Sequence, residues 1–310
     1  MPRRHPSVLA PLLALALAAL LVGCGITSVP GTGAGVRVVA AENFWGSIAA
    51  QVGGSHVYVT NLIANADTDP HTYEPTTQDA RAVADARYVI VNGAGYDPWA
   101  DRLLGANPAS GRKVLNVGDL SGSHAGDNPH LWYNPDNVTA VVARVRDDLK
   151  ALDPAHAADY DQSAQTFLTV GLGKYHTLIT TIKTAYHGTP VGATESIFAE
   201  MAPALGLSLI TPYSYLRAVS EGTDIAAADE ATVERQITQR QIKVLVYNSQ
   251  NTPNNIQAIL KLAQAQRIPV VAITETLPPG MATFQDWQAD QLIVLNQALE
   301  QAARGTPGTP

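Results

Sequence analysis

Short runs of apolar residues alternate along the chain with stretches in which apolar residues recur every three or four positions. The runs predict buried strands, and the recurring positions predict amphipathic helices. In the first part of the chain, Trp45, Ile48 and Val52 have helical spacing. The expected strands there are 36–41, 57–63, 88–92 and 113–117, with a further helix at about 77–86. This alternation favours parallel βαβ units in a doubly wound sheet.

After Asp136 the pattern becomes helical, first over 137–151 and then over a long segment from about 154 to 186. In the longer segment one apolar stripe is formed by Leu168, Leu172, Tyr175, Ile179 and Ile182. Two glycines, Gly171 and Gly173, interrupt it, and each costs about 1 kcal/mol relative to alanine inside a helix. The sequence still predicts one long helix.

Alternation then resumes, and it predicts a second α/β lobe. The expected strands are 190–194, 208–211, 243–248 and 269–274, and the expected helices are 196–205, 229–239, 253–266 and 285–303. The fold class is therefore α/β, with two doubly wound lobes on either side of one long helix. We expect an N-terminal lobe over 36–153, a linking helix over 154–187 and a C-terminal lobe over 188–303.

The N-terminus has the features of an export signal, with two arginines followed by an apolar run over 8–22 that is too short for an ordinary transmembrane helix. The run ends in Leu21-Val-Gly-Cys24, which resembles the bacterial lipobox. Because Cys24 is the only cysteine, no intrachain disulfide explains it. We expect a lipoprotein signal peptide over 1–23, lipidation at Cys24, a flexible tether over 24–35 and a disordered tail over 304–310.

Composition narrows the class of partner. The 310 residues are 46% hydrophobic, which provides ample material for packed cores. The formal net charge is -7 and the chain has no long basic run, which argues against a nucleic-acid partner because a phosphate backbone requires clustered positive charge. We expect a monomer with a small ligand.

Four polar side chains follow predicted strands, where ligands bind in open α/β sheets. The residues are His71, His130, Glu195 and Glu275, two from each predicted lobe. Imidazole and carboxylate groups are ligands for borderline divalent ions, so these four residues are a candidate metal site. Each also has an ordinary explanation, because loop histidines are often solvated and the two glutamates could be first-turn acids that a helix dipole favours.

A polar stretch over 67–79 surrounds the first histidine. A proline precedes both candidate histidines, at positions 70 and 129, and restricts the backbone that presents each ring. We expect Asp69, Glu74 and Asp127 to orient the rings, as metal-bound histidines usually require. The end of the stretch, 76–79, has the spacing of a helix capping box.

Five segments together resemble a known family. They are Ala41-Glu-Asn-Phe-Trp-Gly46, Asp69-Pro-His-Thr-Tyr-Glu-Pro75, Asn128-Pro-His-Leu-Trp132, Ala193-Thr-Glu-Ser196 and Thr274-Glu-Thr-Leu277. In this order they resemble the metal-binding lipoproteins, or solute-binding proteins, of bacterial zinc and manganese ABC importers. The resemblance implies two lobes joined by one rigid helix, with the metal in the cleft between them. It also implies His71, His130, Glu195 and Glu275 as the ligands.

The chain differs from the family pattern in ways that bear on the metal. Zinc-specific members usually have a histidine at the position of Glu195, the fourth ligand is commonly an aspartate rather than Glu275, and the loop 120–127 is short with one histidine. Oxygen-rich ligation favours Mn²⁺ on hardness, whereas the intrinsic affinity order places Zn²⁺ above Mn²⁺. The sequence leaves both ions open.

The resemblance implies a receptor on the extracytoplasmic face of the cell membrane, anchored through Cys24, which delivers Zn²⁺ or Mn²⁺ to an ABC permease and its ATPase. It is not expected to be an enzyme. The alternatives are an exported metallohydrolase and an adhesin with a structural metal. The hydrolase is disfavoured because the chain lacks His-Glu-x-x-His, a Gly-x-Ser-x-Gly elbow and a Cys-His pair.

Overall fold

The computed structural model describes residues 35–65, 68, 70 and 73–305. The expected signal peptide, Cys24, the expected tether up to residue 34 and the expected tail from residue 306 lie outside these residues. From Gly35 onward the chain forms one compact unit. None of the helices in the described residues is both long enough and apolar enough to cross a membrane.

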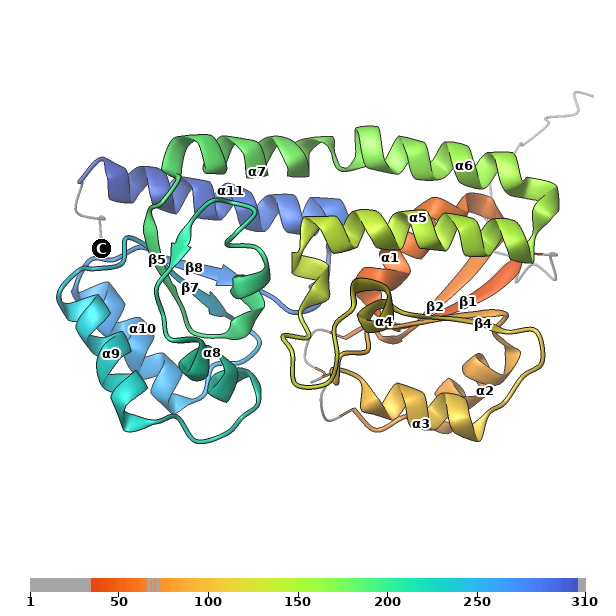
Figure 1. Ribbon diagram of the computed structural model, residues 1–310, viewed down its shortest axis with the longest axis horizontal. Coiled ribbons are helices and arrows are strands. Elements are labelled where there is room, and N and C mark those ends of the chain that lie inside the picture. Colours follow the sequence, from red (N-terminus) through yellow and green to blue (C-terminus); the bar gives the residue numbers. More distant parts are fainter. Residues whose placement is uncertain (1–34, 66–67, 69, 71–72, 306–310) are drawn as a thin grey trace, which may run out of the picture. The chain divides into compact units, whose positions relative to one another are not determined.

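The N-terminal lobe is built on a parallel sheet with the strand order β2-β1-β3-β4 (Figure 1). The strands are β1 (Val36–Glu42), β2 (Val57–Ile63), β3 (Tyr88–Val91) and β4 (Lys113–Asn116). The helices of this lobe are α1 (Asn43–Gly53), α2 (Thr77–Asp85), α3 (Pro98–Ala106), α4 (Val117–Ser121) and α5 (Pro135–Leu152). Side chains of α1 and α5 cover one face of the sheet, and those of α2 and α3 cover the other.

The C-terminal lobe repeats this arrangement with the order β6-β5-β7-β8. Its strands are β5 (Pro190–Ala193), β6 (Ser208–Leu209), β7 (Leu245–Asn248) and β8 (Val270–Ile273). Its helices are α8 (Tyr213–Ser220), α9 (Ala227–Thr238), α10 (Asn254–Ala265) and α11 (Phe284–Ala303). The two parallel sheets confirm the predicted fold class.

Four short elements differ from the sequence-based expectation. Helices α3, α4 and α8 were not predicted, and the helix expected at 196–205 is a 3₁₀ turn over Ser196–Glu200 followed by further turns. Pro203 lies within the expected helix and has no amide hydrogen to donate. The backbone there forms the i to i+3 bond from Met201 N to Phe198 O instead (3.1 Å).

The linking helix is bent rather than continuous. It consists of a 3₁₀ turn (Pro154–His156), α6 (Ala157–Thr166), a π turn (Phe167–Gly171) and α7 (Gly173–Tyr186). In the π turn the amide of Leu172 donates to the carbonyl of Phe167, five residues back, at 2.8 Å. The expected interruption at Gly171 and Gly173 thus takes the form of one wide turn. A π turn changes the direction in which the side chains of the following helix point. Both halves of the linking helix nevertheless have a buried face, with Tyr160 buried in α6 and Tyr175 buried in α7.

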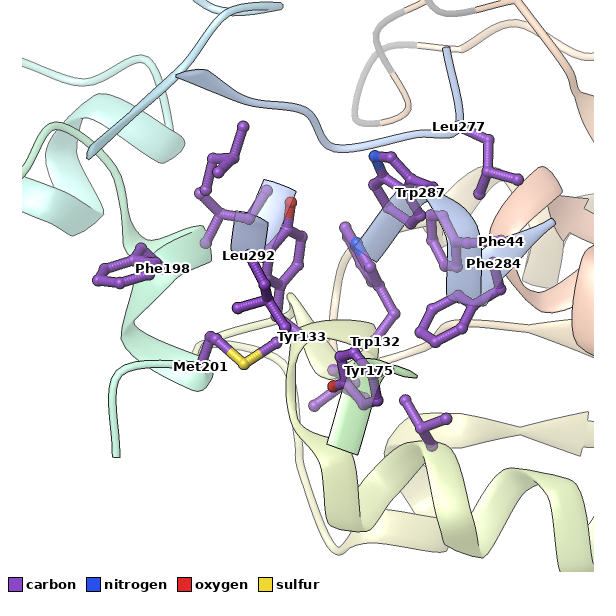
Figure 2. Close-up of a cluster of buried hydrophobic side chains, with 14 of the residues drawn as sticks. Phe44, Trp132, Tyr133, Tyr175, Phe198, Met201, Leu277, Phe284, Trp287 and Leu292 are labelled. Carbon is purple, nitrogen blue, oxygen red and sulfur yellow. The ribbon is translucent and has the colours of Figure 1, made fainter. Parts of the chain in front are cut away.

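One hydrophobic core runs through both lobes. In Figure 2, Phe44 and Trp132 of the N-terminal lobe lie in the same cluster as Phe284 and Trp287 of α11. Phe44 and Trp132 stack with ring centroids 4.0 Å apart. Helices α7 and α11 pack together along one side of this cluster. The lobes are therefore joined by buried apolar contacts as well as by the linking helix.

Candidate metal centre

His130 is fully buried and held in one orientation. Its Nδ1 lies 2.7 Å from Oδ1 of Asn128, whose Nδ2 donates to the carbonyl of Ser196 in the other lobe at 2.8 Å. Because this amide presents its oxygen to the ring, Nδ1 carries a proton. The Nε2 lone pair of the neutral ring is then directed away from Asn128, which is the arrangement a metal ligand needs.

Glu275 faces His130 across the lobes. It lies two residues after the end of β8, and its Oε1 lies 3.0 Å from His130 Nε2. With Nδ1 protonated, this contact requires a second proton between Nε2 and Oε1, and a metal ion bound by both groups would displace that proton. The backbone amide of Glu275 donates to Gln250 Oε1 at 2.6 Å, which fixes the start of the loop.

Glu195 follows β5 and is 2% exposed. One of its oxygens, Oε1, accepts a hydrogen bond from Asn251 Nδ2 at 2.9 Å. The other, Oε2, is buried and has no hydrogen-bond partner. A buried carboxylate oxygen without a partner is costly, and coordination to a cation would offset that cost.

The electrostatics of the three residues are coupled. Burial lowers the pKa of His130 to about 4, and the negative charge of Glu195 partly opposes this shift. Burial, together with the negative charge of Glu275, raises the pKa of Glu195 to about 7, while His130, Asn251 and Asn248 act in the opposite direction. At neutral pH His130 is therefore uncharged and can act as a ligand, and Glu195 is close to its titration point.

His71 lies outside the described residues, and so does Asp69. The positions beside His71 are held in the N-terminal lobe, because the carbonyl of Pro70 accepts a hydrogen bond from Trp99 Nε1 at 2.9 Å and Tyr73 packs edge-on against the same indole. The assignment of His71 as a ligand stays a prediction. Within the described ranges, no three His, Cys, Asp or Glu side chains are grouped closely enough to hold a metal ion.

Of the residues expected to orient the histidines, Asp127 is not the one bonded to His130, and the roles of Asp69 and Glu74 beside His71 stay predictions. Glu74 is exposed, and Asp127 is exposed and accepts a bond from the amide of His124 at 2.9 Å. The partner of His130 is the neighbouring Asn128 instead. An amide can accept from Nδ1 and donate across the cleft at once, which a carboxylate cannot do.

The capping box at the end of the polar stretch is confirmed. Thr76 accepts a bond from the amide of Asp79, and Asp79 accepts one from the amide of Thr76 at 2.7 Å. The hydroxyl of Tyr73 also donates to Asp79 at 2.7 Å. This part of the stretch therefore starts α2.

Sequence analysis missed two buried acids in the N-terminal lobe. Glu42, at the end of β1, is fully buried, and its carboxyl group lies beside that of Asp97. Asp97 accepts bonds from the amides of Asn92 (2.7 Å) and Gly93 (2.8 Å). Burial raises the pKa of Glu42 well above its usual range and that of Asp97 to about 6. The rule that selects polar residues at strand ends would have found Glu42.

Two parallel α/β sheets, with ligand-type side chains of both lobes meeting in a buried contact, define a solute-binding protein of bilobal type. Residues 38–298 match the family model described as zinc-uptake complex component A, periplasmic. The chain belongs to this family, which is a family of solute-binding proteins and not of enzymes.

Curated relatives carry names that refer to several metals. The chain is 30% identical over 161 residues to manganese-binding lipoprotein MntA of Halalkalibacterium halodurans, covering 50% of this chain and 53% of the relative. It is 27% identical to iron-binding protein YfeA of Yersinia pestis, covering 42% and 44%. The chain thus spans about half the length of these two relatives. It is 25% identical to the metal ABC transporter substrate-binding lipoprotein FimA of Streptococcus parasanguinis, covering 79% of each.

Solved structures confirm the fold. A Mn-bound mutant of a periplasmic metal-binding protein from Candidatus Liberibacter asiaticus superposes with a TM-score of 0.73 at 20% identity, covering 85% of this chain and 99% of that one. FpvC from Pseudomonas aeruginosa, solved in complex with Mn²⁺, gives a TM-score of 0.70 at 16% identity, covering 86% and 99%.

Proposed function

We propose that this protein is an extracytoplasmic solute-binding protein that captures a divalent transition metal, Zn²⁺ or Mn²⁺, and delivers it to an ABC permease for import. The ligands are His71 and His130 from the N-terminal lobe and Glu195 and Glu275 from the C-terminal lobe. Membership of the zinc-uptake family supports this function.

One observation carries the proposal: an imidazole of the N-terminal lobe and two carboxylates of the C-terminal lobe are each buried and lie near enough to shift one another's pKa values, and Glu195 Oε2 has no hydrogen-bond partner. Burial of a carboxylate oxygen without a partner is costly when no cation is bound. A cation between the lobes would use this oxygen, the Nε2 lone pair of His130 and the Glu275 carboxylate at once.

Capture and release follow from the ligands' positions. Four protein ligands close the coordination sphere of a zinc-like ion, which suits transport because a catalytic metal keeps a position for water or substrate. Since the ligands come from two lobes, separating the lobes lowers the number of ligands and frees the ion. The partners of this step are the permease and its ATPase.

We further propose that Cys24 carries the lipid that anchors the protein to the outer face of the cell membrane, and that the protein acts as a monomer. The lipoprotein names of the relatives MntA and FimA support the anchor. Mass spectrometry of the membrane fraction should find a diacylated N-terminal peptide that begins at Cys24. The anchor would be contradicted if the Cys24→Ala variant were still found diacylated at its N-terminus in the membrane fraction. A free thiol at Cys24 of the mature protein would contradict it as well.

Native mass spectrometry and titration calorimetry of the full chain with Zn²⁺ and Mn²⁺ test the metal site. We expect one ion per chain, and a loss of affinity of about 10-fold or more in His130→Ala and Glu195→Ala. His176→Ala is a matched control, because this exposed histidine lies on α7 away from the site. If neither ion binds the wild-type chain, or if the site variants bind as tightly as the control, the proposed function is wrong.

A further inference from the structure

Helix α1 carries a row of polar side chains that bind a segment of the other lobe. Asn43, Ser47 and Gln51 are four residues apart and therefore lie on one side of the helix. They contact the segment 277–285, which joins β8 to α11 and begins two residues after Glu275. The row lies beside the apolar side of α1 that packs into the common core.

The contacts in this row are reciprocal at both ends. Asn43 Nδ2 donates to the carbonyl of Leu277, and the amide of Leu277 donates to Asn43 Oδ1, both at 3.1 Å. Gln51 and Gln285 exchange two bonds of 3.0 and 2.7 Å. Between them the amide of Phe284 donates to Ser47 Oγ at 2.9 Å.

The Asn43 contact is the most protected of these. Asn43 is 8% exposed and Leu277 is 6% exposed. In Figure 2 the Leu277 side chain lies in the same apolar cluster as Phe44, the residue next to Asn43. Removal of the Asn43 side chain would leave a buried N–H and a buried C=O of Leu277 without partners, which costs more than the bonds themselves contribute.

A second N-terminal-lobe residue holds the other side of Glu275. The hydroxyl of Tyr133 donates to the carbonyl of Thr274 at 2.8 Å. The C-terminal lobe also holds this segment, through Gln250 at the amide of Glu275 and Gln291 at the amide of Thr274. Glu275 therefore lies on a crossing between the lobes that is fixed from both sides.

Glu195 is held differently. Its own hydrogen bond comes from Asn251 of the C-terminal lobe. The neighbouring residue Ser196 makes the contacts with the N-terminal lobe: its carbonyl accepts from Asn128 Nδ2 at 2.8 Å, and its hydroxyl lies 3.3 Å from Asn128 Oδ1 and 3.3 Å from His130 Nδ1. The loop after Glu195 is therefore joined to the N-terminal lobe by bonds of 2.8, 3.3 and 3.3 Å at Ser196 and one of 3.5 Å at Glu200, whereas the row on α1 has five bonds of 2.7 to 3.1 Å.

We propose that the two carboxylates separate unequally when the lobes open: Glu275 stays close to His130, Glu195 withdraws, and Asn43 is the positioning residue that keeps Glu275 in place. In this proposal the lobes rotate about the bonded contact between α1 and the segment 277–285. Glu275 lies next to this contact and moves little, because displacement grows with distance from the axis of rotation. This inference rests on the proposed function, since it assigns roles to ligands of that same site.

A double-mutant cycle on metal affinity tests the role of Asn43. In the full chain, Asn43→Ala should weaken Zn²⁺ or Mn²⁺ binding about 10-fold, the size expected for loss of a group that positions a ligand. In a Glu275→Ala background the same change should have less than about a twofold effect, because the ligand it positions is absent. In a Glu195→Ala background the effect should again be about 10-fold.

Controls separate positioning from general destabilisation. Asn107→Ala removes a similar amide bond, to the carbonyl of Leu103 far from the cleft, and should leave affinity unchanged. If Asn43→Ala does not fold, Ser47→Ala replaces it and should show a smaller effect with the same dependence on Glu275. Equal effects of the Asn43 change in the Glu275→Ala and Glu195→Ala backgrounds would overturn the inference. Failure of the wild-type chain to bind either ion would instead overturn the proposed function.

Spin-label distances test the movement itself. In a Cys24→Ser full chain, labels at exposed Arg81 in α2 and Pro279 in the crossing segment should keep their separation when Zn²⁺ is added. Labels at Arg81 and at exposed Glu234 in α9 should change theirs. If both separations change alike, or if neither changes, the unequal movement is wrong even where binding itself is intact.

Discussion

At the residue scale, the site combines two groups whose burial shifts their pKa values in opposite ways. Burial keeps His130 neutral, and Asn128 orients the ring so that Nε2 faces Glu275. Glu195 has a raised pKa and an oxygen without a partner. His130 is therefore neutral and oriented as a metal ligand is, and Glu195 lowers the stability of the fold when no metal is bound.

The cost of Glu195 predicts a stabilising substitution. Its folded pKa of about 7 lies above the ordinary value of 4.5, so the folded state binds this proton more tightly and ionisation opposes folding. The cost grows as pH rises from about 4.5 to about 7 and is constant above that. Glu195→Gln should raise the free energy of unfolding at pH 8 by up to about 3 kcal/mol.

Urea denaturation in the presence of a chelator measures this effect. The gain should shrink towards pH 5, where Glu195 is protonated in the folded state. Asn251 would still donate to the amide oxygen of glutamine, so the hydrogen bond is kept. No gain at pH 8, or an equal gain at pH 5, would contradict the prediction.

The same pKa predicts how metal affinity depends on pH. Because the metal binds the carboxylate form, a proton on Glu195 competes with it below pH about 7. Metal affinity should fall about 10-fold when the pH is lowered from 7 to between 6 and 5.5. The fall with pH should become steeper near pH 4, where His130 is also protonated. Calorimetric titration across this range measures the fall, and Glu195→Gln should flatten it between pH 6 and 8. An unchanged profile in that variant would assign the competing proton elsewhere.

At the element scale, strands and long helices could be predicted because their apolar pattern is local. Helix α2 is as short as α3 but starts with a capping box that the sequence shows, whereas α3 and α8 have no side-chain N-cap hydrogen bond. The turn at 196–200 depends on Pro203 and on packing. Glu195 and Glu275 could be proposed as ligands because strand ends are defined in the sequence, and His130 because a proline precedes it as one precedes His71. Their partners Asn128 and Asn251 could not, because amides are common in loops and Asn251 lies 56 residues from Glu195.

The π turn of the linking helix sets the phase between its two halves. Deletion of Val170, which is 73% exposed, would convert this turn towards an α helix and rotate α7 by about 100° relative to α6. Tyr175 and Ile182 would leave the core, so the free energy of unfolding should fall by about 3 kcal/mol or more.

Val170→Ala is the matched control for this deletion. It changes the same exposed position without changing the phase, and it should alter stability by less than about 0.5 kcal/mol. Urea denaturation compares the two variants. A deletion as mild as the substitution would show that the π turn does not set the phase of α7.

At the scale of the whole molecule, the common core and the inter-lobe site make metal binding and global stability a single equilibrium. An ion at 100 times its Kd should stabilise the chain by about 2.7 kcal/mol. For a chain of this size we expect a rise in Tm of about 5 to 10 °C. Scanning calorimetry should show one transition that shifts with added Zn²⁺ or Mn²⁺. His130→Ala should lose most of the shift, and a full shift in that variant would contradict the site.

The shared core also means that the chain cannot be divided at its linking helix. A fragment ending there would expose Phe44 and Trp132 to water, and the complementary fragment would expose Phe284 and Trp287. Each half would then present an aromatic surface wide enough to drive aggregation. Although the two sheets have the same strand order, neither half is a module that recombination could transfer alone. The two lobes should therefore be inherited and transferred together, as one domain.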